Sequence, residues 1–217
     1  MNPAPLLSVL QTVVEVSATL AFAASGLLAA ERKRLDPVGV CIVTGLAAFG
    51  GGTLRDVLLD RRPFFWVAHP EWLWILIALS AAAMLFLRAR HVALTERAMQ
   101  WPDALGLGLF SASGTQIALA QGLPPIVAVL MGVITACFGG VLRDIVCNEI
   151  PSALRDHRPY AICAFAGGWV LVGAESAGLD PFVSIAAGAL TASALRAIAL
   201  LTDTRLPGWS TGKPPPG

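Results

Sequence analysis

The chain has 217 residues, of which 56% are hydrophobic and 13% are charged, and its mean hydropathy is +0.70. This balance excludes a disordered chain, a coiled coil and an ordinary soluble domain, and it indicates an all-α integral membrane protein. The net charge of +1 excludes a nucleic-acid binder, because such proteins carry a large excess of basic residues. We therefore expect a lipid bilayer as a partner and no nucleic acid.

Apolar runs bounded by prolines and charge clusters predict seven transmembrane helices. In chain order they are Leu6–Ala30, Val38–Leu59, Trp72–Leu87, Pro102–Ala120, Ile126–Cys147, Tyr160–Ala174 and Pro181–Leu201. They form a single transmembrane domain over residues 1–205. The segment 206–217 is rich in Pro and Gly, and we expect it to be disordered.

The basic residues outside these runs fall mainly on one side of the membrane. Ten Lys and Arg residues share that side, and only Arg61 and Arg62 belong to the other. Loops rich in Lys and Arg stay in the cytoplasm. This asymmetry predicts an outside N-terminus and a cytoplasmic C-terminus, which agrees with an odd number of spans.

An internal repeat occurs at a constant offset of 88 residues. The segment GGTLRD at Gly51–Asp56 matches GGVLRD at Gly139–Asp144, and FAASG at Phe22–Gly26 matches FSASG at Phe110–Gly114. Each copy carries three predicted helices, so the second copy must enter the membrane from the opposite side. We therefore expect two inverted three-helix repeats plus a seventh helix, at about residues 7–90, 101–178 and 181–201.

Glycines cluster near the middle of the second and fifth predicted helices. Each glycine costs about 1 kcal/mol relative to alanine in a helix, and consecutive glycines favour kinks. A break there frees backbone carbonyls near the bilayer centre, where they can coordinate a monovalent cation. The alternative is that the glycines only let helices approach closely. The predicted pore and kink residues are Phe49, Gly50, Gly51, Gly52, Phe138, Gly139 and Gly140.

Charged pairs follow both glycine segments at equivalent depths. Ionisable groups in a membrane normally face a partner or a water-filled cavity. Arg55–Asp56 and Arg143–Asp144 are therefore predicted to line two vestibules or to form structural ion pairs. Further candidates for a polar lining are Glu15, Ser25, Thr53 and Ser113, and the offset relates Glu15 to Asp103.

At GGGTLRDVLLDRRP and FGGVLRDIVCNEIP the sequence resembles the prokaryotic members of the trimeric intracellular cation (TRIC) channel family. Bacterial members also carry glycine-transporter and UPF0126 labels. The resemblance covers about Leu7 to Leu201 and implies a homotrimer whose protomers each hold an hourglass-shaped pore for monovalent cations, chiefly potassium. It also implies that the second and fifth helices are kinked at Gly50–Gly52 and Gly139–Gly140.

The leading functional prediction is a passive K+ or Na+ channel in a bacterial inner membrane, without a cofactor. The alternatives are a secondary transporter of glycine or another small zwitterion, and a membrane scaffold whose repeat only reflects duplication. An enzyme is not expected, because no Ser or Cys stands where a spaced His and acid would activate it.

Overall fold

The computed structural model describes residues 4–90, 96–155 and 158–207, and this part of the chain contains nine helices. They are α1 (Ala4–Arg32), α2 (Pro37–Leu58), α3 (Phe65–Ala68), α4 (Glu71–Arg90), α5 (Glu96–Ala120), α6 (Pro125–Val146), α7 (Ser152–Arg155), α8 (Ala161–Ser176) and α9 (Pro181–Thr202). The seven long helices correspond to the seven predicted ones. The short helices α3 and α7 were not predicted, and the expected disordered tail lies outside the described residues from residue 208 onward.

Prolines and aspartates start several of these helices. Pro37, Pro125 and Pro181 each stand in the first turn, where the missing N–H costs no helical hydrogen bond. The side chain of Asp36 accepts a hydrogen bond from the backbone N–H of Gly39 at 2.7 Å, which caps α2. These local signals explain why the predicted starts of the second, fifth and seventh helices agree with the structure to within one residue.

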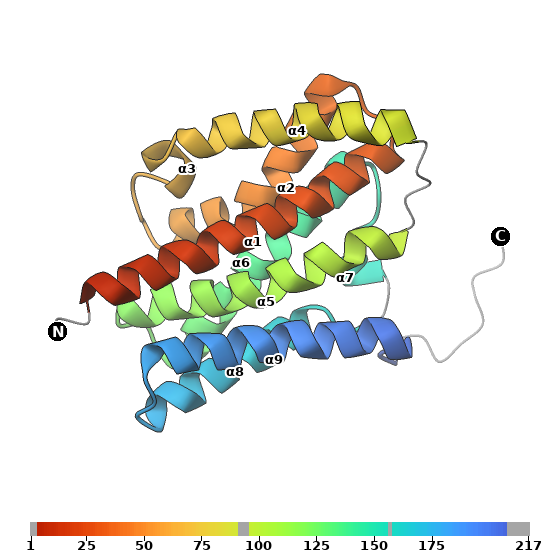
Figure 1. The fold of residues 1–217 in the computed structure, drawn as a ribbon. Coiled ribbons are helices and arrows are strands. Elements are labelled where there is room, and N and C mark those ends of the chain that lie inside the picture. Colours follow the sequence, from red (N-terminus) through yellow and green to blue (C-terminus); the bar gives the residue numbers. More distant parts are fainter. Residues whose placement is uncertain (1–3, 91–95, 156–157, 208–217) are drawn as a thin grey trace.

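The repeat predicted from the sequence is visible in the helices themselves. The offset of 88 residues relates both ends of α2 to both ends of α6, and it relates the short helix α3 to α7 within one residue. In Figure 1, α1 runs from left to right whereas its equivalent α5 runs from right to left. The two copies are therefore inverted relative to each other.

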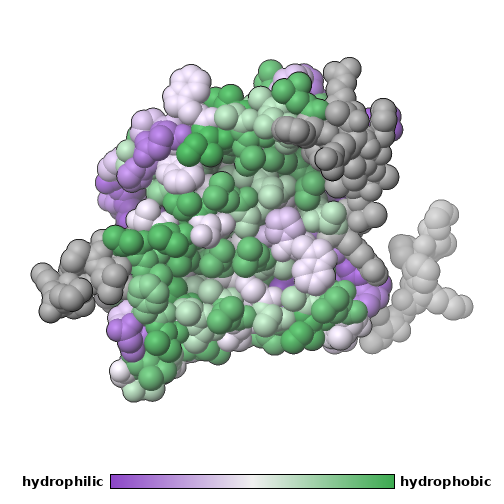
Figure 2. Space-filling model, in the orientation of Figure 1, coloured by the Kyte–Doolittle hydropathy of each residue, from purple (hydrophilic) through white to green (hydrophobic). Residues whose placement is uncertain are grey.

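Four of the described helices are long and apolar enough to cross a membrane: α1 from Val9 onward, α2, α6 and α9. The helices α4, over Glu71–Leu85, and α8 are apolar but shorter. Figure 2 agrees with this distribution, because apolar side chains cover the middle of the visible face and hydrophilic ones gather toward its left and right ends. The chain is thus a multi-pass membrane protein.

The helix α5 differs from the prediction in its start and in its composition. It begins at Glu96 and includes Pro102 in its interior, whereas the sequence predicted a start at Pro102. It is less apolar than the other long helices because it contains several polar and charged residues, of which Gln100, Asp103 and Gln116 are buried. These polar side chains face the protein interior, which is possible because α5 packs against α1, α6, α8 and α9.

The helices form successive layers, with α4 on one side of α1 and α2, and α8 and α9 beyond α5 and α6 (Figure 1). The main apolar core lies at the junction of the two repeats. There Phe22 of α1 stacks on Phe110 of α5 with ring centroids 5.5 Å apart, and both side chains are buried. These two phenylalanines are equivalent under the offset of 88 residues.

Both glycine-containing helices run without interruption. Helix α2 is continuous through Gly50–Gly52, and α6 is continuous through Gly139–Gly140. The break expected from the sequence, with freed carbonyls near Phe49 and Phe138, is therefore not found in this structure. The physical reason is that close contacts with a neighbouring helix offset the low helix propensity of these glycines.

Candidate functional site

Helices α2 and α6 cross at their glycines with backbone in contact with backbone. A Cβ atom on Gly51 would overlap the carbonyl oxygen of Thr135, and one on Gly139 would overlap that of Ala47. The offset of 88 relates Ala47 to Thr135 and Gly51 to Gly139, so the two contacts are equivalent. Of the two interpretations left open by the sequence, close helix approach therefore accounts for these two glycines.

The other predicted kink residues surround this crossing. A Cβ on Gly50 would meet the side chain of Leu142 of α6 at 2.7 Å, whereas one on Gly52 would have only Arg55 within 4 Å. The side chain of Phe49 lines a pocket beside α2. Phe138, which the offset relates to Gly50, is 37% exposed, whereas Cys137, the equivalent of Phe49, is buried.

In repeat one, Arg55 joins two carboxylates in the protein interior. Its Nη1 lies 2.6 Å from Oε1 of Glu15, and its Nε donates to Oδ1 of Asp56 at 2.8 Å. Asp56 also accepts from Arg61 at 3.2 Å. The Arg55 side chain is 1% exposed, so the ion pairs offset the high cost of placing a guanidinium in the membrane.

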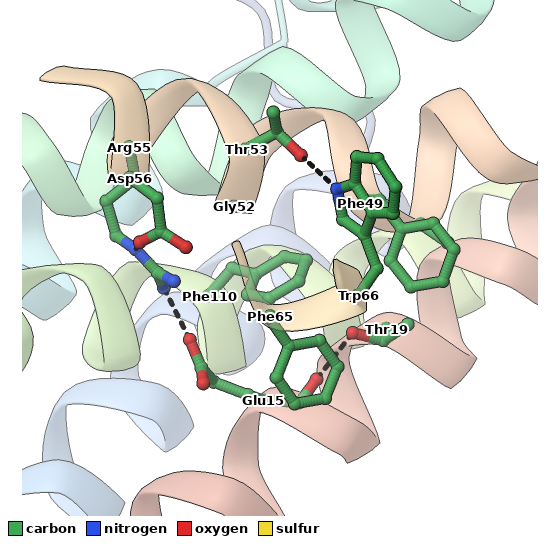
Figure 3. A pocket seen from close by; sticks show the side chains of 11 residues that line it. Glu15, Thr19, Phe49, Gly52, Thr53, Arg55, Asp56, Phe65, Trp66 and Phe110 are labelled. Atoms are coloured by element: carbon green, nitrogen blue, oxygen red, sulfur yellow. Dashed lines mark hydrogen bonds and ion pairs between the residues drawn. The ribbon is translucent and has the colours of Figure 1, made fainter. Parts of the chain in front are cut away.

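These groups border a small pocket between α1, α2, α3 and α5, with an accessible volume of about 20 Å³ (Figure 3). Its polar lining comes from Glu15, Thr19, Thr53, Arg55 and Asp56, and its aromatic lining comes from Phe49, Phe65, Trp66 and Phe110. Thus Glu15, Thr53, Arg55 and Asp56, which the sequence singled out separately, meet in one place.

The short helix α3 is tied to this pocket by one hydrogen bond. The indole N–H of Trp66 donates to the hydroxyl of Thr53 at 3.0 Å, as Figure 3 shows. Replacing Thr53 with valine removes the acceptor, and we expect a destabilisation of about 1 kcal/mol. Thr53→Ser keeps the hydroxyl and serves as the control. Equal thermal unfolding midpoints for both variants in detergent would show that this bond contributes nothing to stability.

The equivalent site of repeat two is built around Arg143. Its Nη1 donates to Oδ1 of Asp103 at 2.7 Å and to the hydroxyl of Ser25, and its Nε donates to Oδ1 of Asp144 at 2.8 Å. The hydroxyl of Tyr160 donates to Oδ2 of Asp103 at 2.7 Å. All five side chains are buried, and Ser25 comes from repeat one, so this site joins both repeats.

Ser113, the equivalent of Ser25, does not join the repeat-one site in the same way. Its hydroxyl is buried and has no hydrogen-bond partner among the described residues. Asp144 has a further role, because its second oxygen accepts from the backbone N–H of Ser152 at 2.8 Å and so fixes the start of α7. The two sites are therefore related by sequence but not identical in their partners.

Three buried residues at the repeat-two site were not predicted as functional residues from the sequence. The repeat relates Asp103 to Glu15, but the sequence alone assigns no function to Tyr160 or Arg196. The sequence contains a signal for two of them. Tyr160 is the single tyrosine of the chain, and Arg196 is the single charge in the apolar run Pro181–Leu201. In a membrane helix, a lone charge marks a functional candidate.

Comparison with known proteins identifies the family to which this chain belongs. A family described as "Glycine transporter" matches residues 12–90 and 100–176, which are the two repeats. A UPF0126 membrane protein of Vibrio cholerae is 33% identical over 93% of this chain and 83% of its own length. The UPF0126 inner membrane protein YadS of Escherichia coli is 37% identical over 72% of this chain and 75% of its own length. The chain belongs to the TRIC/UPF0126 family.

Solved structures of TRIC channels share the fold. The TRIC trimeric intracellular cation channel orthologue from Rhodobacter sphaeroides is 33% identical, with a TM-score of 0.82 over 89% of this chain and 98% of that one. A prokaryotic TRIC channel crystallised in 0.5 M KCl is 26% identical, with a TM-score of 0.83 over 90% of this chain. These relatives are membrane proteins and cation channels rather than enzymes. As a TRIC family member, this chain is a transmembrane protein of the cation channel class.

Proposed function

We propose that the protein is a passive channel for monovalent cations, chiefly K+, with one pathway between the two repeats of each protomer. The observation that carries this proposal is the arrangement of α2 and α6. The two helices cross at Gly51 and Gly139, and a buried arginine with two carboxylates follows the crossing on each helix. A narrow centre flanked by charged groups matches an hourglass-shaped conduction path.

We infer a closed state from the tightness of this crossing. Overlap of a Cβ atom with carbonyl oxygens at Gly51 and Gly139 means that backbone atoms fill the centre. In our proposal, the two helices bend apart at these glycines when the channel opens. Carbonyls near Phe49 and Phe138 then become available to a partly dehydrated K+ or Na+ ion.

The membrane arrangement follows from the same proposal. We assign seven spans to α1, α2, α4, α5, α6, α8 and α9, although α5 is less apolar than the others. Arg32 at the end of α1 and Lys33 just beyond it pair with Glu149 beyond α6, at 3.7 and 2.7 Å. These charges belong to the basic end of the bundle, which we place in the cytoplasm together with the C-terminus. The host membrane is the bacterial inner membrane, as in the Escherichia coli relative.

We also propose a homotrimer, which draws on the word "trimeric" in the name of the Rhodobacter sphaeroides relative. Each protomer contains both repeats, so the pathway is complete within one chain. The trimer then contributes to assembly in the membrane rather than to the lining of the pathway. Crosslinking of the purified protein in detergent, followed by a mass measurement, tests this number of subunits.

Glycine transport is the second candidate, because the matching family is described as a glycine transporter. A glycine carboxylate needs an available cationic group or an exposed helix N-terminus. Arg55 and Arg143 already bind two carboxylates each, and α2 and α6 continue unbroken through Gly52 and Gly140. The structure therefore favours the channel over the transporter.

One preparation distinguishes the two functions. The purified protein is reconstituted into planar bilayers under a K+ gradient and, in parallel, into liposomes supplied with radiolabelled glycine. We expect discrete single-channel openings carried by K+ and no saturable glycine uptake, because a continuous pathway needs no substrate-binding cycle. Saturable uptake without unitary currents would overturn the channel in favour of the transporter.

A further inference from the structure

The two equivalent arginine sites differ in one respect that the repeat does not explain. The repeat-one site opens onto the pocket of Figure 3, and Gly52 at its edge faces nearly empty space. At the equivalent Gly140, a Cβ atom would meet both the Asp103 carboxylate and the Tyr160 hydroxyl at 3.4 Å. Tyr160 thus fills in repeat two the space that remains open in repeat one.

The residue equivalent to Tyr160 in repeat one takes a different position. It is Trp72, which is only partly buried and stacks on Phe65 with ring centroids 6.1 Å apart. Trp72 is not among the residues that line the repeat-one pocket. An aromatic residue at this position therefore does not by itself close the site, and something outside the repeat must hold Tyr160.

Helix α9 holds Tyr160 in place, and this helix has no counterpart in repeat one. Arg196 of α9 lies with its guanidinium 4.8 Å from the centre of the Tyr160 ring, and its Nη1 donates to the Pro159 carbonyl at 3.1 Å. Beyond the end of α9, Asp203 accepts from Arg158 at 2.8 Å. Three consecutive residues, 158 to 160, are thus held by α9 and the residue that follows it, immediately before α8 begins.

A contribution to stability does not by itself explain why an arginine side chain is buried at position 196. Its side chain is 1% exposed, its Nε has no hydrogen-bond partner, and none of the described carboxylates pairs with it. A buried cation without a carboxylate is costly. The contact that compensates part of this cost is the aromatic face of Tyr160, since a desolvated cation–π contact is stronger than an exposed one.

We propose that Arg196 is a positioning residue for gating: it holds the Tyr160 ring so that the hydroxyl stays on Asp103 and closes the repeat-two half of the pathway. The chain of contacts runs from Arg196 to Tyr160, Asp103 and Arg143. This inference rests on the proposed channel function. It makes α9, which lies outside the duplicated unit, the element that keeps the two vestibules unequal.

The test measures access of water-soluble reagents to each site. Ser25→Cys places a thiol in the closed repeat-two site, and Thr53→Cys places one in the open repeat-one pocket as the matched control. Full-length protein in liposomes is treated with a small cationic methanethiosulfonate reagent, and mass spectrometry identifies the modified cysteine. We expect Arg196→Met to raise the modification rate at position 25 at least tenfold and to leave the rate at position 53 unchanged.

Several outcomes would overturn the proposal. An unchanged rate at position 25 in an assembled Arg196→Met protein contradicts it, and an equal rise at both positions indicates general loosening instead. If Arg196→Met does not assemble, Tyr160→Phe removes only the hydroxyl that reaches Asp103. In that variant an unchanged rate at position 25 is equally contrary to the proposal.

Single-channel recording separates this proposal from the function on which it rests. We expect Arg196→Met and Tyr160→Phe each to raise the open probability severalfold, with the same unitary conductance as the unmodified protein. If the unmodified protein passes no K+ current while the rate at position 25 still rises in Arg196→Met, the channel function fails. The role of Arg196 in holding Tyr160 then stands without it.

Discussion

Replacing Gly51 with alanine is expected to destabilise the protein by about 3 kcal/mol or more, because the added methyl group meets a backbone carbonyl that cannot rotate away. The carbonyl belongs to Thr135 of α6, and the equivalent change at Gly139 meets that of Ala47. The expected result is a lower unfolding temperature and loss of monodispersity in detergent. Gly139→Ala should behave in the same way.

Gly45 of α2 provides the control for this substitution. A Cβ atom there has no neighbour within 4 Å, so Gly45→Ala should be neutral or stabilising by up to about 1 kcal/mol through helix propensity. Thermal unfolding of the three variants beside the unmodified protein measures the difference. If Gly51→Ala were as stable as Gly45→Ala, the tight crossing of α2 and α6 would be wrong.

Replacing Arg143 with methionine is expected to cost about 3–5 kcal/mol, because it leaves buried carboxylates without their cation. Asp103 and Asp144 both lose a partner at 2.7–2.8 Å. Adding Asp103→Asn in the same chain should recover part of the loss, since a neutral amide needs no counter-charge. Unfolding temperatures in detergent report both effects.

A surface arginine gives the matched control for Arg143. Arg61 pairs with Asp56 at 3.2 Å, but its side chain is 40% exposed. Exposed ion pairs contribute about 0–1 kcal/mol, so Arg61→Met should change the stability little. A large loss for Arg61→Met, or a negligible one for Arg143→Met, would mean that burial does not determine the energy of these pairs.

Much of this fold was readable from the sequence because the relevant signals are local or repeated. Proline and charge clusters predicted the seven long helices, and the offset of 88 residues predicted the inverted repeat. The same offset related Glu15 to Asp103 before any contact was known. The helix α5 was harder to delimit, because the apolar pattern begins after Pro102 although the helix begins at Glu96.

The site was less predictable because long-range packing determines it. Glycines in the middle of a helix look the same in the sequence whether they break the helix or let a neighbouring helix approach. For Gly51, only the position of the Thr135 backbone shows that close approach is the role. The offset predicted charged pairs at equivalent depths, but it did not predict that Tyr160 lies beside Gly140 whereas Gly52 has no such neighbour. The contact between Arg196 and Tyr160 joins residues from different helices, and no periodicity in either helix encodes it.

The stack of Phe22 on Phe110 carries a consequence for the origin of this architecture. A residue that contacts its own equivalent lies at a two-fold axis, as in an isologous dimer. A half-length ancestor inserted into the membrane in both orientations would form the same stack between two copies of a single phenylalanine. Because both halves belong to one chain here, equivalent positions are free to hold different residues, as Trp72 and Tyr160 do.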